Sequence, residues 1–278
     1  MNLRELLAEE DVEHRKTLSE LKFLELLRER ARNSHVVMKH TPIFREDSGA
    51  DFIFVTPVEK DTRSAFWVDK LIKGFQSWKR FPSRVHFIKG YTSIERVGGA
   101  DDDHYVVIPL DRARIGVCPD VAFYRSFSKA KEGMGISRVD NDGLGKWIEQ
   151  VVRSLSELEP DASLEALAPN NYQEFRKQLR ALDSVLRGHQ ADLRKKIKSN
   201  ESLEPADRKI LTDLIDRHVT DAESYLAEKL DPEQNGFSSV RIESFSSVTG
   251  DREVWIDDSC LLIKRRKYIE MHEEGTIK

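Results

Sequence analysis

The chain has 278 residues, of which 39% are hydrophobic and 34% charged, and its formal net charge is only -4. Gly and Pro occur at ordinary frequencies, which excludes collagen-like and low-complexity proteins, and the apolar content excludes a wholly disordered chain. No stretch approaches the roughly 20 apolar residues that a membrane helix needs, so we expect no membrane association. Charge this dense and this balanced is typical of solvent-facing helices and lacks the basic excess of a nucleic-acid-binding protein.

The two cysteines, Cys118 and Cys260, lie far apart and form no CxxC motif. This spacing excludes a disulfide framework and disfavours a cysteine zinc site. The first five residues include charged ones, and no apolar stretch typical of a secretory signal follows them. We therefore expect a reducing, cytoplasmic compartment.

Residues 1–34 are predicted to form a helical arm. Leu18, Leu21, Leu24 and Leu27 recur every three positions among charged residues and would give the helix one apolar face. Such a face is typical of a helix packed on its own domain, and it would also suit a docking or oligomerising arm.

Strand-like segments characterise the next region, residues 35–140. Runs rich in β-branched and aromatic residues, bounded by Pro, Gly and Asp, lie at 51–55, 84–88, 105–108 and 115–117. Between the first two runs, apolar residues at helical spacing predict one helix. The order strand, helix, strand, strand indicates a unit that mixes helices and strands.

A helical hairpin is predicted over residues 141–235. In 172–193 and again in 211–226, apolar residues recur at steps of three and four, as in a coiled-coil seam. Segment 171–198 holds eight basic and three acidic residues, whereas segment 199–231 holds four basic and nine acidic ones. Opposite charges favour pairing of the two helices. A nucleic-acid-binding arm is the alternative for the basic helix, although its acidic neighbour would cancel the field.

Strand texture returns in residues 236–278, with runs at 240–242, 252–256 and 260–263. The polar tripeptide between the last two runs predicts a tight hairpin. The expected fold class is therefore α+β. A mixed β-sheet domain, split between residues 35–140 and the C-terminal region, would carry an inserted antiparallel helical hairpin and an N-terminal helix.

Motifs for metal and nucleotide chemistry are scarce in the sequence. The run from Asp101 to His104 is rich in ligand types, but four consecutive residues cannot all face one ion, so a solvated loop is the simpler interpretation. The histidines are scattered, and neither a P-loop nor a nucleophile-elbow motif occurs. No metal is predicted. A nuclease using Asp101, Asp103 and a distant acid is a weak alternative, since no basic groove is evident.

Two polar positions beside apolar strands are candidates for chemistry. Glu253 opens an apolar strand, and a carboxylate there either lies in water at the strand edge or projects into a cleft toward a ligand. Tyr91, Thr92 and Ser93 follow another apolar run. Hydroxyls there either orient a carboxylate or cap the next turn.

A hydroxyl segment at the end of one strand, followed later in the chain by an acidic residue at the start of another, resembles the ADP-ribosyltransferase fold. That family carries a Ser-Thr-Ser strand end and a Glu-x-Glu motif beside a late strand. The first motif would be Tyr91-Thr92-Ser93 and the second Asp251-Arg252-Glu253. Segments 82–93 and 104–109 look in particular like ADP-ribosyltransferase-like proteins of bacteriophages. The resemblance covers the two strand-bearing halves and not the helical insertion.

The resemblance implies a substrate and a role for each matching residue. NAD would be the cofactor consumed, and Glu253 would stabilise the oxocarbenium-like transition state as nicotinamide leaves. Ser93 would orient Glu253, and Asp251 would stand where the family activates the acceptor. The family's strand-one Arg has no match here, so Arg84 and Arg63, with Thr92 and Tyr91, are the NAD-binding candidates.

Two functions are therefore expected from the sequence. The first is an ADP-ribosyltransferase that modifies a macromolecular target, a protein rather than a nucleic acid, in the cytoplasm (the host cytoplasm if the chain is of phage origin). The alternative is a non-catalytic protein that binds partners, or assembles copies of itself, through its helical hairpin.

Overall fold

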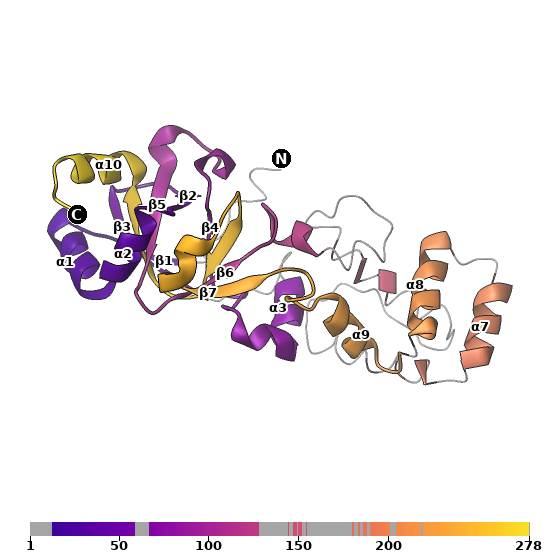
Figure 1. Cartoon of the computed structure of the whole chain (residues 1–278). Helices are drawn as coiled ribbons and strands as arrows, with labels where there is room; N and C mark the ends of the chain where they lie inside the picture. The colour runs from indigo at the N-terminus through magenta and orange to yellow at the C-terminus, as the bar shows by residue number, and fades with distance from the viewer. Residues whose placement is uncertain are drawn as a thin grey trace. The chain divides into compact units, whose positions relative to one another are not determined.

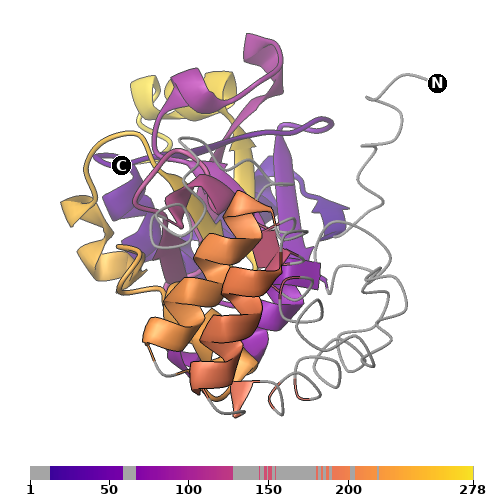
Figure 2. The same cartoon turned by 90° about the vertical axis from the view of Figure 1, so that its right-hand side faces the viewer.

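The computed structural model describes residues 13–58, 67–127, 190–200, 204–217 and 219–277, together with single positions between 144 and 187. This part of the chain is an α+β protein built on a nine-stranded sheet (Figures 1 and 2). The α+β class predicted from the sequence is therefore confirmed.

The strands of the sheet come from both ends of the described chain. They are β1 (Glu13–Thr17), β2 (Ile43–Glu46), β3 (Phe52–Pro57), β4 (Ile88–Tyr91), β5 (His104–Pro109), β6 (Arg114–Val117), β7 (Ser238–Arg241), β8 (Glu253–Ile256) and β9 (Cys260–Lys264). Their order is β1-β3-β9-β5-β2-β4-β8-β6-β7, and all these neighbours run antiparallel. The prediction of a mixed sheet is corrected, because the helix after β3 leads to β4, which is not a neighbour of β3.

The described helices lie before, between and after these strands. They are α1 (Glu20–Arg30), α2 (Arg32–Met38), α3 (Trp67–Gly74), α7 (Gln190–Ser199), α8 (Pro205–Asp216), α9 (Ala222–Lys229) and α10 (Arg265–Glu273). Short 3-10 helices are η1 (Gln76–Arg80), η2 (Ile94–Arg96), η3 (Asp101–Asp103), η4 (Tyr124–Ser126) and η5 (Ile242–Ser247). Side-chain caps begin two of the helices: Ser19 accepts from the Lys22 backbone N–H and Asp221 from that of Ser224.

The chain divides into two compact units. The sheet unit comprises Met1–Asp61, Lys79–Ala122 and Phe237–Lys278, and the helical unit comprises Thr62–Trp78 and Phe123–Gly236. All nine strands belong to the sheet unit, whereas α3 belongs to the helical unit together with α7, α8 and α9.

Strands β5 and β9 are buried on both faces within the sheet unit. Every residue of β5 is buried, and so are the first four residues of β9. Phe23 of α1 packs on Phe52 of β3 with 4.8 Å between ring centroids, and α10 contacts both β5 and β9. The continuous apolar runs of these strands therefore reflect cover on two sides.

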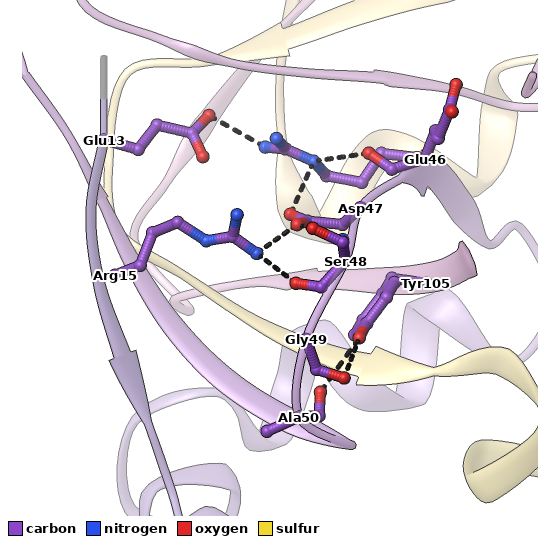
Figure 3. Close-up of polar contacts among 9 residues, drawn as sticks. Glu13, Arg15, Glu46, Asp47, Ser48, Gly49, Ala50 and Tyr105 are labelled. Carbon is purple, nitrogen blue, oxygen red and sulfur yellow. Dashed lines mark hydrogen bonds and ion pairs between the residues drawn. The ribbon is translucent and has the colours of Figure 1, made fainter. Parts of the chain in front are cut away.

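Strands β1 and β2 approach each other although three strands separate them in the sheet order. Arg45 of β2 lies 2.8 Å from Glu13 of β1, and Arg15 of β1 forms an ion pair with Asp47, just after β2 (Figure 3). Neighbouring strands lie about 4.8 Å apart, so a flat sheet would hold these side chains out of reach. This half of the sheet must therefore curve, and we call the four residues the β1–β2 clasp.

In the helical unit, aromatic packing and ion pairs join segments distant in sequence. The ring of Trp78 lies 5.8 Å from that of Phe123, and its indole N–H donates to the Leu230 carbonyl at 2.8 Å. Helices α7 and α8 lie side by side (Figure 2), and Arg194 of α7 is 2.9 Å from Asp216 of α8. The basic and acidic segments recognised in the sequence thus meet in at least this pair.

The seams predicted for the hairpin are only partly within the described residues. Tyr172, Phe175, Leu179 and Leu182 lie outside them, whereas Leu186, Leu193, Leu211, Ile215, Ala222 and Leu226 are described and buried. The second seam is not one helix, because α8 ends at Asp216 and α9 begins at Ala222.

Three further predictions about local structure are wrong. The N-terminal region is not helical throughout, since residues 13–17 form β1 by pairing with β3; the part of the predicted arm before residue 13 lies outside the described residues. The run 84–88 is not a strand over its length, since β4 begins only at Ile88. The hairpin after β8 does not form, because β8 lies between β4 and β6 whereas β9 lies between β3 and β5.

Candidate functional site

Glu253 and its neighbours form a cluster on one face of β4 and β8. Glu253 pairs with Tyr91, and Trp255 pairs with Lys89. Directly paired residues share a face, and residues two apart on one strand do too, so all four side chains lie on the same face. Gly116 of β6 pairs with Trp255 on the other side.

Two cations approach the Glu253 carboxylate. Its side chain is 5% exposed, and the Arg84 guanidinium lies 3.5 Å from Oε1 while the Lys89 ammonium lies 3.8 Å from Oε2. Arg84 is equally buried, whereas Lys89 is half exposed. Burial acts to lower the pKa of Lys89, but Glu253 and Tyr91 outweigh it, and the pKa is raised. These distances exceed those of tight charge-assisted hydrogen bonds, about 2.7–2.9 Å.

Aromatic rings surround the two cations. The Arg84 guanidinium carbon lies 4.0 Å from the ring centroid of Phe87 and 5.4 Å from that of Trp255, and Lys89 Nζ lies 5.1 Å from the ring of Tyr91. These are cation–π distances. We call Arg84, Phe87, Lys89, Tyr91, Glu253 and Trp255 the β8 cluster.

The backbone around Trp255 fixes the position of its ring. The indole N–H donates to the carbonyl of Pro82 at 3.0 Å, which holds the segment before β4 against β8. The ring lies over Gly116, where a Cβ would stand 2.1 Å from a ring carbon. Glycine is therefore the residue that lets the indole lie flat on β6.

The predicted hydroxyl segment lies at the end of β4, beside the turn that precedes β8. The Thr92 hydroxyl donates to the carbonyl of Gly250 at 2.8 Å and accepts from the Arg252 backbone N–H at 2.8 Å. Ser93 immediately precedes η2, and its side chain does not cap that helix. Thr92 therefore tethers the turn that leads into Glu253.

The predicted site residues separate into two groups in the structure. Arg84, Tyr91 and Glu253 lie together in the β8 cluster. Asp251 instead pairs with Arg96 at 3.1 Å near the surface, and no hydrogen bond among the described residues joins Ser93 to Glu253. Arg63 lies outside the described residues.

Sequence reasoning missed Lys89 as a cluster member. Lys89 could have been found from strand alternation, because it stands two residues before Tyr91 and therefore on the same face. Phe87, which the resemblance implied as a ring that could stack on nicotinamide, precedes the regular strand and reaches the cluster through Arg84.

The acidic run at Asp101 pairs with His104 beside it and with Arg266 of α10, whose guanidinium lies 3.5 Å from Asp102. His104 Nδ1 lies 3.5 Å from Asp101, and its Nε2 is 3.1 Å from the Gly98 carbonyl oxygen. Across the described positions, no group of three His, Cys, Asp or Glu side chains is arranged to hold a metal ion.

Comparisons with known proteins add no relative. No family model, no curated protein and no solved structure matches this chain. Among the helices that the structure describes, none is both long enough and apolar enough to cross a membrane.

Proposed function

We propose that the protein is an ADP-ribosyltransferase that consumes NAD and modifies a macromolecular target, with Glu253 as the catalytic carboxylate. The β8 cluster would receive NAD, and the sheet unit would be a divergent member of the ADP-ribosyltransferase fold. Glu253 would hydrogen-bond the nicotinamide ribose and stabilise the positive charge that develops as nicotinamide leaves. Arg84 and Lys89 would hold anionic parts of NAD, and Tyr91 or Trp255 would stack on its rings.

The contact between Arg84 and Glu253 carries this proposal. The two residues are 169 positions apart; Glu253 matches the family's late motif, and Arg84 is a candidate to replace the family's missing Arg. Their 3.5 Å separation places a buried guanidinium beside the carboxylate, at a distance longer than that of a tight charge-assisted hydrogen bond. Aromatic faces next to the same cations suit a ligand that combines phosphates with planar rings.

A second candidate function is binding of a protein partner through the helical unit, in the cytoplasm and without catalysis. The ion pair between Arg194 of α7 and Asp216 of α8 supports an antiparallel hairpin with one basic and one acidic helix. In an enzyme the same hairpin would recruit the protein target, or join copies of the chain.

The test measures release of nicotinamide and transfer of label from radiolabelled NAD to lysate proteins. The proposal predicts both activities in the full chain and at least about a 100-fold loss in Glu253→Gln, since that change removes the charge and keeps the shape. Glu243→Gln, at an exposed position of η5, is the matched control and should keep full activity. Equal turnover by Glu253→Gln and the parent would overturn the catalytic assignment. Absence of turnover from a folded parent, together with a stable complex on sizing, would favour the binding function.

A further inference from the structure

A second cluster of titratable side chains lies between α2 and α10, away from β8. The rings of His35 and His272 stack with centroids 5.4 Å apart, and Tyr268 meets both edge-on at 6.0 Å and 4.6 Å. His35 and Tyr268 are 5% and 8% exposed. Two histidines and a phenol therefore form the contact between the two helices.

One polar atom of each of these three rings lacks a hydrogen-bond partner among the described residues. His35 Nε2, Tyr268 Oη and His272 Nε2 are all buried, and none of them hydrogen-bonds to another described residue. Buried polar groups are normally paired, so a set of three marks a contact that tolerates neutral rings only. An imidazolium here would bury a charge whose Nε2–H has no acceptor.

The charges that face the cluster oppose protonation. Burial, then His272, then Lys39 lower the pKa of His35 to about 4, and burial and Lys39 lower that of His272. Lys39 lies at the C-terminal end of α2 itself. Helix α1, β5 and η5 also pack against α2, but no charged residue on them shifts the His35 pKa. No carboxylate among these described neighbours therefore offsets a proton on either ring.

We propose that the His35–Tyr268–His272 cluster is an acid-sensitive latch between α2 and α10. At neutral pH the uncharged rings stack and hold the C-terminal helix on the sheet unit. When the medium becomes acidic, a proton on either imidazole repels the other ring and Lys39 and draws the cluster toward water. Helix α10 then separates locally while the sheet, whose strands hydrogen-bond independently of it, stays folded.

The other contacts of α10 fit a latch that opens by itself. Met271 is fully buried beneath the helix, whereas the ion pairs from Lys267 to Glu20 and from Arg266 to Asp102 are at the surface. Surface ion pairs contribute little, so the ring cluster and Met271 provide most of the attachment. Opening would expose Met271 and the apolar side of α10.

Hydrogen exchange of the full chain, read by mass spectrometry over 260–264 and 265–273, tests the latch. After correction for intrinsic rates, exchange in α10 should be at least about tenfold faster at about pH 5 than at about pH 7.5, while β9 stays protected. His35→Phe keeps a ring at the contact and removes one of the two titrations, so it should reduce the acceleration, and the double variant with His272→Phe should abolish it. His14→Gln, on exposed β1, is the matched control and should behave as the parent.

Three results would overturn the proposal. These are an α10 whose protection does not change with pH, an α10 and a β9 that lose protection together, and a His35→Phe variant that accelerates like the parent. If His35→Phe fails to fold, His272→Phe serves in its place, and the difference between α10 and β9 in the unmodified chain still decides the question.

Discussion

The β8 cluster and the β1–β2 clasp are both partly buried sets of charges on the same sheet, yet their contacts differ. In the clasp, Arg45 lies 2.8 Å from Glu13 and 3.3 Å from Asp47, and Arg15 also donates to the backbone carbonyl of Ser48 at 2.9 Å (Figure 3). Burial acts to lower the pKa of Arg45, but the charges of Glu13 and Asp47 outweigh the effect of burial, and the pKa is raised. The clasp therefore pairs two basic residues with two acidic ones, and Arg15 also bonds to the backbone.

The β8 cluster has longer ion pairs, at 3.5 and 3.8 Å, and aromatic faces beside its cations. Short, backbone-anchored pairs fix strand positions, whereas the β8 cluster combines longer ion pairs with aromatic rings. We propose on this contrast that the clasp serves folding and that the β8 cluster serves ligand binding. Each prediction below would separate these two roles or remove the distinction.

The largest effect on stability is expected in the clasp. Arg45→Ala leaves Glu13 and Asp47 partly uncompensated, and removal of one partner of a buried pair costs about 3 kcal/mol or more. Urea denaturation should show this loss, and NAD turnover per folded molecule should stay at the parent's level. Arg241→Ala, exposed on β7, should change the free energy of unfolding by less than about 0.5 kcal/mol. A loss of turnover in folded Arg45→Ala would contradict the proposal that the clasp serves folding only.

Acidification should lower stability through the α2–α10 contact. Because the pKa of His35 is about 4 in the folded chain and near 6.5 when exposed, the unfolded chain binds the proton first as pH falls. The stability that neutral His35 contributes is therefore fully present above pH 6.5 and declines toward pH 4, by about 3 kcal/mol. Over this interval the free energy of unfolding of the parent, taken from denaturation curves, should fall by about that amount relative to that of His35→Phe, which lacks this titration. Parallel curves would contradict the prediction.

A methyl group at Gly116 should disturb the β8 cluster and leave the clasp intact. The added Cβ meets the Trp255 ring, so Gly116→Ala should cost about 1–3 kcal/mol and reduce NAD turnover as Trp255 moves. At Gly98 a Cβ would meet only the movable end of Glu46, which makes Gly98→Ala the control. Thermal melts and turnover of the two variants give the comparison. Unchanged melting temperature and turnover in Gly116→Ala would show that the position of the Trp255 ring is not fixed.

The smallest effect separates the two hydroxyls of the predicted motif. Thr92→Val removes two hydrogen bonds to the turn before β8 and should cost about 1–2 kcal/mol, with a raised KM for NAD. Ser93→Ala should change stability by less than about 0.5 kcal/mol, since its side chain caps nothing in η2. A larger effect of Ser93→Ala than of Thr92→Val on stability and KM would instead support the role that the resemblance implies for Ser93, orienting Glu253.

The sequence predicted those parts of the fold that local pattern determines. The apolar runs of β3, β5, β6, β8 and β9 were found because buried strands need continuous β-branched and aromatic residues. Strand β1 was missed because four of its five residues are exposed, so only pairing with β3 makes it a strand. The turn after β8 looked like a hairpin because polar residues reverse a chain whether or not the flanking strands pair.

The candidate site was predictable in its two central residues. Glu253 was named from motif order and Arg84 as a substitute for the family's unmatched Arg, and the fold brings the two to 3.5 Å. Asp251 was expected beside the acceptor but pairs with Arg96, because the end of the turn points it to the surface. Distances between side chains from distant segments depend on how the chain folds. The spacing of residues along a single sequence does not give them.

Hydrogen exchange in the presence and absence of NAD tests the central claim that the β8 cluster is the ligand site. The account predicts slower exchange over 84–91 and 253–256 when NAD is added, with no change over 13–17 and 43–47, and loss of that protection in Arg84→Gln. Protection confined to the clasp, or none at saturating NAD in the folded chain, would contradict it.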